Sequence, residues 1–198
     1  MKYRLKKIKW ELAKLLKRGQ IIMIKPSMKC NLKCPYCSVN WHTGKPPEYN
    51  EHDYNYWIDV IWKEQPKMVA ISGGEPGIYK DLHKIANYCI TNKILVQIVT
   101  NLTNIGEYVK IKPSWRVMFW STYHHSSHKG RYLFNYDYLK FKFIIVTKEL
   151  EKPKELPFSR MVELKTEFTN TIYPYKIFAP DGRVFHSCYE IDISGNKY

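Results

Sequence analysis

The chain has 198 residues, with 32 Lys and Arg against 18 Asp and Glu, so its formal net charge is +14. This length fits one domain, and a composition of 44% hydrophobic and 15% aromatic residues argues against intrinsic disorder. No apolar run approaches the roughly 20 residues of a membrane span. Lysines also interrupt the N-terminal segment where a signal peptide would be apolar. We therefore expect a cytoplasmic protein without a membrane span.

Residues 1–19 are expected to form a basic amphipathic helix. Residues 1–20 contain eight bases and one acid, a net charge of +7, and apolar residues recur there at helical spacing. These apolar residues are Leu5, Ile8, Leu12, Leu15 and Leu16. Such a helix fits a polyanion, an anionic membrane surface or an acidic protein partner. The alternative is a helix that packs its apolar stripe on the body and leaves its lysines in water.

Three of the five cysteines fall within eight residues, at Cys30, Cys34 and Cys37. An odd number of cysteines without a secretion signal argues against a disulfide framework, and a cytosolic cluster is more typical of metal binding. Thiolates suit zinc or an iron–sulfur cluster. Closed sites of both kinds take four ligands. Three local thiolates therefore leave a position for a distant ligand or a bound small molecule.

Strands are predicted wherever apolar, β-branched runs occur. These runs cover residues 21–25, 67–72, 94–99, 116–120 and 141–146, with a weaker one over 161–164. Helical patterns lie between most of them, over 53–64, 80–92, 104–110 and 131–140. Alternating strands and helices predict a parallel sheet.

Polar and glycine-rich segments follow these strands at the point where each one ends. The cysteines follow the first strand, and Gly73-Gly74-Glu75-Pro76 follows the second. Thr100-Asn101 follows the third strand and Ser121 the fourth. Because active sites of such folds form at the carboxyl ends of the strands, we expect these segments to meet at one edge.

Two of these segments resemble the motifs of the radical S-adenosylmethionine (SAM) superfamily. They are Cys30-x-x-x-Cys34-x-Tyr36-Cys37 and Gly73-Gly74-Glu75-Pro76, in this order and at strand ends. The resemblance covers about residues 20–165 and implies a partial (β/α)6 TIM-like barrel. Here the barrel would have a basic N-terminal helix and a C-terminal β-hairpin. The expected division is residues 1–19, a core over 20–170 and an extension over 171–198, in one domain overall.

The resemblance also implies roles for the motif residues. Cys30, Cys34 and Cys37 would ligate three irons of a [4Fe–4S] cluster, with SAM on the fourth. The SAM-binding residues would be Tyr36 beside the adenine, Gly73, Gly74, Glu75 and Pro76 near the methionine amine, and Thr100, Asn101 and Ser121 near the carboxylate or ribose. Electron transfer from the reduced cluster would cleave SAM to a 5′-deoxyadenosyl radical that abstracts hydrogen from an unidentified substrate. A flavodoxin or ferredoxin would supply the electron.

Several of these residues also have ordinary structural explanations. The two glycines could form a turn that ends a strand, and Tyr36 could be a packed aromatic residue. Asn101 and Ser121 could cap the helices that follow their strands. Cys89 lies in an apolar helical stretch and is expected to be a small buried hydrophobe.

Substrate contacts are expected after the fourth strand and near the C-terminus. His124 and His125 follow the fourth strand, where either could contact substrate or transfer protons. Residues 172–188 predict two strands joined at Pro180-Asp181-Gly182. This stretch resembles the entry to the cysteine-rich extension of peptide-modifying radical SAM enzymes. Cys188 is the last cysteine, however, and one cysteine cannot hold an auxiliary cluster.

Two other functions fit parts of the pattern. A glycyl-radical-enzyme activase would use the same chemistry on a partner protein, in a chain of similar length. A non-catalytic zinc or iron–sulfur module would use the basic N-terminal helix to hold nucleic acid, with affinity falling steeply in salt. The second function leaves the Gly73–Pro76 segment unexplained.

Overall fold

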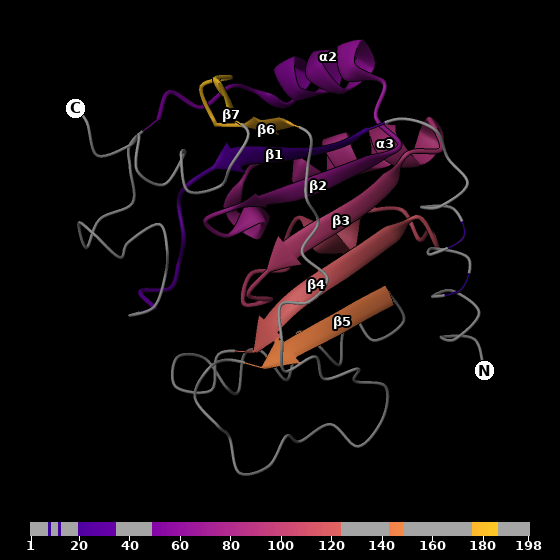
Figure 1. Ribbon diagram of the computed structural model, residues 1–198. Coiled ribbons are helices and arrows are strands. Elements are labelled where there is room, and N and C mark those ends of the chain that lie inside the picture. Colours follow the sequence, from indigo (N-terminus) through magenta and orange to yellow (C-terminus); the bar gives the residue numbers. More distant parts are fainter. Residues whose placement is uncertain are drawn as a thin grey trace.

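One sheet of seven strands organises the part of the chain that the structure describes (Figure 1). This computed structural model describes residues 20–34, 49–123, 143–148 and 176–185, together with Ile8 and Leu12. In sheet order the strands are β5 (Phe143–Lys148), β4 (Val117–Tyr123), β3 (Leu95–Thr100), β2 (Met68–Gly73), β1 (Ile21–Ser27), β6 (Lys176–Phe178) and β7 (Val184–Phe185). Strands from β5 to β6 pair in parallel, and β7 pairs antiparallel with β6. The carboxyl ends of six strands therefore share one edge.

Two α-helices, α2 (Tyr54–Glu64) and α3 (Leu82–Thr91), lie where the helical patterns predict them. Helix α2 begins at Asp53, whose carboxylate accepts a hydrogen bond from the Tyr56 amide at 3.1 Å. It ends at Gln65, which adopts a left-handed conformation with φ 45°. Both helices pack on the same face of the sheet through one apolar cluster.

The helix predicted over 104–110 is wrong. The structure has only a short 3₁₀ turn there, η2 (Tyr108–Lys110). The Asn104 side chain accepts a hydrogen bond from the Gly106 amide at 3.3 Å, and such local bonds compete with helix formation. A similar turn, η1 (Pro76–Ile78), follows β2.

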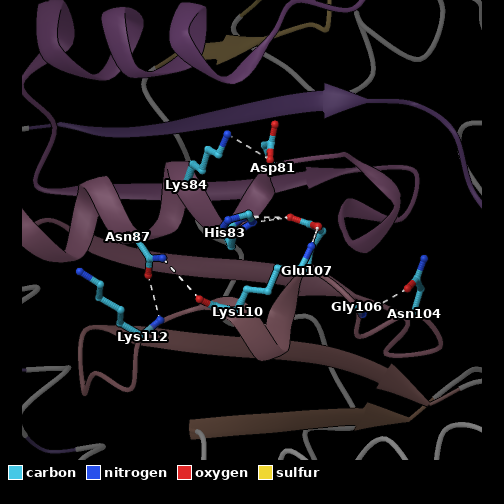
Figure 2. A network of polar contacts seen from close by, with 9 residues as sticks. All are labelled: Asp81, His83, Lys84, Asn87, Asn104, Gly106, Glu107, Lys110 and Lys112. Atoms are coloured by element: carbon cyan, nitrogen blue, oxygen red, sulfur yellow. Dashed lines mark hydrogen bonds and ion pairs between the residues drawn. The ribbon is translucent and has the colours of Figure 1, made fainter.

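Polar contacts join η2 to α3 on the outside of the sheet (Figure 2). Glu107 accepts hydrogen bonds from His83 Nδ1 at 2.7 Å and Lys110 Nζ at 2.6 Å. Asn87 of α3 donates to the Lys110 carbonyl at 3.4 Å and accepts from the Lys112 amide at 2.8 Å. These contacts fix the connection between β3 and β4.

The two faces of the sheet have different side chains, as alternation along each strand requires. The face under the helices is apolar and includes Ile22, Ile24, Val69, Ile71, Val96, Ile98 and Phe119. Cys89 of α3 is fully buried in this cluster, and burial raises the pKa of its thiol to about 12. Cys89 is thus the buried hydrophobe that the sequence predicts.

The C-terminal strands extend the sheet beside β1 rather than beside β5. They join at Gly182, which has φ +82°, and the Gly182 amide donates to the Ala179 carbonyl at 2.9 Å. A Cβ atom at Gly182 would lie 2.1 Å from Tyr56 Oη of α2. The turn therefore needs glycine both for its backbone angle and for its contact with α2.

Other sequence expectations lie wholly or partly outside the described residues. The strand over 161–164 and the helix over 131–140 are outside them. In the N-terminal segment, Ile8 and Leu12 are helical and each is about half exposed. Within the described part of the chain, no helix is long and apolar enough to cross a bilayer.

Candidate functional site

The loop that carries the first two cysteines is joined to the glycine-rich segment by backbone hydrogen bonds. Cys30 and Cys34 follow β1, and both are half-buried. The Gly74 amide donates to the Ser27 carbonyl at 3.1 Å, and the Glu75 amide donates to the Lys29 carbonyl at 2.8 Å. The position of the cysteine loop therefore depends on the end of β2.

Both glycines are required by this close approach. Gly73 has φ +124°, which residues with side chains rarely adopt. A Cβ atom at Gly73 would lie 2.1 Å from the Ser27 carbonyl oxygen, and one at Gly74 would lie 2.1 Å from the Lys29 carbonyl oxygen. The segment thus does more than end a strand, because it lets two loop backbones touch.

The Glu75 carboxylate points into the protein and is fully buried. Oε1 accepts hydrogen bonds from the Gly77 amide at 3.0 Å, from Thr100 Oγ1 at 2.7 Å and from the Tyr108 hydroxyl. Oε2 accepts from the Asn101 amide at 2.7 Å. Four donors from η1, from the end of β3 and from η2 therefore meet on one carboxylate.

Burial raises the pKa of Glu75, and the hydrogen bonds from Tyr108, Asn101, Thr100 and Gly77 oppose this rise only in part. Burial, together with the neighbouring Glu75, also raises the pKa of Tyr108 well above its usual value. The carboxylate thus anchors three segments of the site. The contact expected between Gly73–Pro76 and SAM stays a prediction. Because the Glu75 side chain is occupied by internal donors, the backbone of this segment would have to make it.

Thr100 and Asn101 lie at the same edge, and both are buried. Thr100 Oγ1 accepts a hydrogen bond from the Leu102 amide at 2.8 Å, in addition to its bond to Glu75. The Asn101 side chain contacts the cysteine loop, with Nδ2 lying 3.2 Å from Asn31 Oδ1 and 3.7 Å from Cys30 Sγ. Ser121 pairs with Thr100 and is fully buried, but it lies inside β4, which continues to Tyr123 rather than ending before Ser121 as the sequence predicts.

The structure thus brings together most of the residues that the sequence predicted for the site. The remaining ones, Tyr36, Cys37, His124 and His125, lie outside the described residues, as does Cys188. Among the described residues no group of three metal-ligating side chains is found. Sequence reasoning missed Asn31, Thr103 and Tyr108; the Asn101-x-Thr103 spacing, typical of a side-chain-capped turn, was the available signal for Thr103.

The donor set described here fits an iron–sulfur cluster. Cys30 Sγ accepts N–H bonds from the Leu32 amide at 3.4 Å and from Asn101 Nδ2 at 3.7 Å. N–H groups directed at sulfur stabilise a thiolate, and Fe–S clusters are held by thiolates. Cys30 and Cys34 also lie at the carboxyl edge of the sheet, where neighbouring loops converge.

Fold and site together define an α/β domain with two cysteines at the carboxyl edge of a largely parallel sheet. The family model described as the radical SAM superfamily matches residues 24–111. This match confirms the resemblance inferred from the motifs. Members of this superfamily bind a [4Fe–4S] cluster and SAM.

Individual relatives agree with this assignment. The chain is 30% identical over 87 residues to 7-carboxy-7-deazaguanine synthase of Clostridium acetobutylicum, covering 43% of this chain and 39% of that protein. Its fold is similar to Streptococcus suis SuiB bound to the precursor peptide SuiA, with TM-score 0.58, 21% identity, and coverage of 76% of this chain and 37% of SuiB. It is also similar to BtrN in complex with AdoMet and 2-DOIA, with TM-score 0.59, 17% identity, and coverage of 90% and 76%.

The matched regions span less than half the length of the synthase and of SuiB. The domain match and these relatives support an enzyme, as the sequence predicts.

Proposed function

We propose that the protein is a radical SAM enzyme whose cluster is held by Cys30, Cys34 and Cys37. The observation that carries this proposal is the meeting of the cysteine loop, Gly73–Pro76 and Thr100-Asn101 at one edge of the sheet. The cluster, once bound and reduced, would supply the electron that cleaves SAM to a 5′-deoxyadenosyl radical. The protein itself supplies binding, orientation and electrostatics.

Each described segment has a definite task in this proposal. The backbone of Gly73–Pro76 would receive the methionine amine, because the Glu75 carboxylate is already occupied by internal donors. Ser121 would contact the ribose or carboxylate of SAM, and Tyr36 the adenine. A flavodoxin or ferredoxin would be the reductant, and the protein would act in the cytoplasm.

The face of the sheet opposite the helices favours a small polar substrate, because it carries buried polar side chains. Gln97 is 4% exposed and pairs in register with Ala70 and Met118 of the face opposite the helices. Lys25 is also 4% exposed and shares this face with Met23 by alternation along β1. Buried polar side chains on this otherwise apolar face suit a substrate that carries polar groups of its own.

Comparison with the relatives supports this substrate class. The synthase is named for a small carboxylated heterocycle, and BtrN was solved with the small molecule 2-DOIA, whereas SuiB was solved with a peptide. His124 and His125 would contact the substrate from the loop after β4.

The test is electron paramagnetic resonance (EPR) of the anaerobically reconstituted, dithionite-reduced protein, with and without SAM. We expect a [4Fe–4S]⁺ signal that changes when SAM is added, and iron and acid-labile sulfide in matching amounts. Cys34→Ala should lose both cluster and SAM cleavage, whereas the control Cys89→Ala should keep them, because Cys89 is buried under the helices.

Two outcomes would contradict the proposal. A cluster signal that ignores SAM would indicate a structural cluster. Bound zinc without iron would indicate the non-catalytic nucleic-acid-binding module instead.

A further inference from the structure

Three polar side chains form a closed ring between the cysteine loop and the end of β3. Asn101 Oδ1 accepts hydrogen bonds from the Thr103 amide at 2.9 Å and from Thr103 Oγ1 at 2.6 Å. Thr103 Oγ1 in turn accepts from Asn31 Nδ2 at 2.8 Å. Asn101 Nδ2 closes the ring by donating to Asn31 Oδ1 at 3.2 Å.

This ring determines which way the Asn101 amide points. A backbone N–H can only donate, so the atom that faces the Thr103 amide must be the Asn101 oxygen. The Asn101 NH₂ group therefore points at the cysteine loop. Exchanging its amide oxygen and nitrogen would place the NH₂ group against the Thr103 amide, so the flipped side chain is excluded. Nδ2 lies 3.7 Å from Cys30 Sγ.

The contact has a direct consequence for a cluster bound through Cys30. N–H bonds to cluster sulfurs stabilise the more negative, reduced form and so raise the reduction potential. The Asn101 side chain lies in a buried position with 8% exposure, where a hydrogen bond is electrostatically stronger than in water. The Leu32 amide, at 3.4 Å from the same sulfur, belongs to the cysteine loop itself, whereas Asn101 belongs to the segment that follows β3.

We propose that Asn101 is a positioning residue that raises the reduction potential of the cluster through its N–H bond to Cys30 Sγ. This inference rests on the proposed function, since it requires a cluster on Cys30. The motif resemblance implies that Asn101 contacts SAM. This inference instead assigns the Asn101 side chain to the sulfur of Cys30.

The test is the midpoint potential of the reconstituted full-length protein, measured by EPR-monitored redox titration without SAM. Asn101→Ala removes the donor and should lower the reduction equilibrium constant by about tenfold, which is about 59 mV for a one-electron couple. Asn101→Ser should give the same shift. Its hydroxyl can still accept from the Thr103 amide, which preserves the turn, but it is too short to reach the sulfur.

Asn31→Ala is the matched control. It opens the same ring, by removing the Asn31 bonds to Thr103 and Asn101, but leaves the amide of Asn101 beside the sulfur. We expect its midpoint potential to stay at the wild-type value. The serine variant covers the case in which Asn101→Ala fails to assemble a cluster.

The outcomes separate this inference from the proposed function. Equal shifts of the midpoint potential in Asn31→Ala and Asn101→Ser would overturn the inference, because the ring would then act only by holding the cysteine loop in place. Unchanged potentials in both Asn101 variants, with a normal response to SAM, would overturn the inference and leave the proposed function standing. A wild-type protein that assembles no cluster would overturn both.

Discussion

Two glutamates, Glu75 and Glu107, hold opposite sides of the turn η2 by different chemistry. Glu75, on the functional edge, is fully buried and meets four uncharged donors, one of them the hydroxyl of Tyr108 in η2. Glu107, on the outside of the sheet, bonds to the side chains of His83 and Lys110 (Figure 2). The same type of side chain therefore anchors uncharged internal donors in one place and accepts from partly exposed side chains in the other.

The pKa values of the two carboxyls move in opposite directions. Burial raises the pKa of Glu75, and its neutral donors offset only part of that rise. Burial acts on Glu107 too, but the bonds from His83 and Lys110 outweigh it and lower the pKa. The comparison shows that, among the described residues, the groups that bond to the Glu75 carboxylate at the carboxyl edge of the sheet are all uncharged. Changes at Glu75 should thus disturb the whole site, and changes at Glu107 only local stability.

The largest expected effect comes from Glu75→Ala. This change leaves buried donors of three segments without an acceptor, and each unsatisfied group costs about 1–3 kcal/mol. We expect a loss of about 4 kcal/mol in the free energy of unfolding, measured by urea denaturation of the cluster-free protein. Glu107→Ala should cost much less, because the ammonium of its partner Lys110 is about half exposed and can bond to water instead. Equal losses in the two variants would contradict the contrast between them.

Gly74→Ala should have the next largest effect. The added methyl group would lie 2.1 Å from the Lys29 carbonyl oxygen and 2.4 Å from that of Met28, so the cysteine loop must move. We expect a loss of about 3 kcal/mol and a lower iron content after reconstitution, since overpacking costs about 1–3 kcal/mol and the contact here is with backbone. The matched control is Gly106→Ala on the outer side, where the nearest atom is 3.6 Å away. A stable, iron-replete Gly74→Ala protein would show that the loop position is not fixed by β2.

Strands and helices were predictable because they depend on local patterns. The run over 67–72 became β2 (Met68–Gly73), and the pattern over 53–64 became α2 (Tyr54–Glu64). The order of motifs after successive strands was enough to predict that they share an edge, because parallel strands end together.

The contacts that complete the site depend on residues far apart in the chain. Asn101 and Asn31 are separated by 70 positions, and Tyr108 and Glu75 by 33. Their meeting depends on sheet register and on the path of the loop after β3. In that loop, backbone amides donate to the side-chain oxygens of Asn101 and Asn104, and the expected helix does not form. The pairing of β6 with β1 is equally long-range, and no local pattern marks it.

Tyr108→Phe tests the internal anchor with a smaller change. The variant keeps the ring, which packs edge-to-face on Phe119, and removes the hydroxyl that donates to Glu75. We expect a loss of about 1.5 kcal/mol in the free energy of unfolding, typical of a hydrogen bond to a charged group. Because one donor is gone, the pKa of Glu75 should rise further. A variant as stable as the wild type would mean that three donors satisfy the carboxylate fully.

The smallest effect, and the one that separates the two carboxyls most clearly, is their pH dependence. The pKa of Glu107 is lowered in the folded protein. Its contribution to the free energy of unfolding is therefore present above the unfolded carboxyl pKa of about 4.3, and it is lost as pH falls through the folded pKa. The pKa of Glu75 is raised in the folded protein. Its contribution to the free energy of unfolding is therefore full below the unfolded carboxyl pKa of about 4.3, and it is lost as pH rises through the folded pKa. The difference in unfolding free energy between wild type and Glu107→Gln, about 1 kcal/mol near neutral pH, should therefore shrink on acidification. The difference between wild type and Glu75→Gln should instead grow. Urea denaturation of the three proteins from neutral to acidic pH measures how each difference in unfolding free energy changes with pH. Changes of the same sign would show that the pKa values of the two carboxyls are shifted in the same direction.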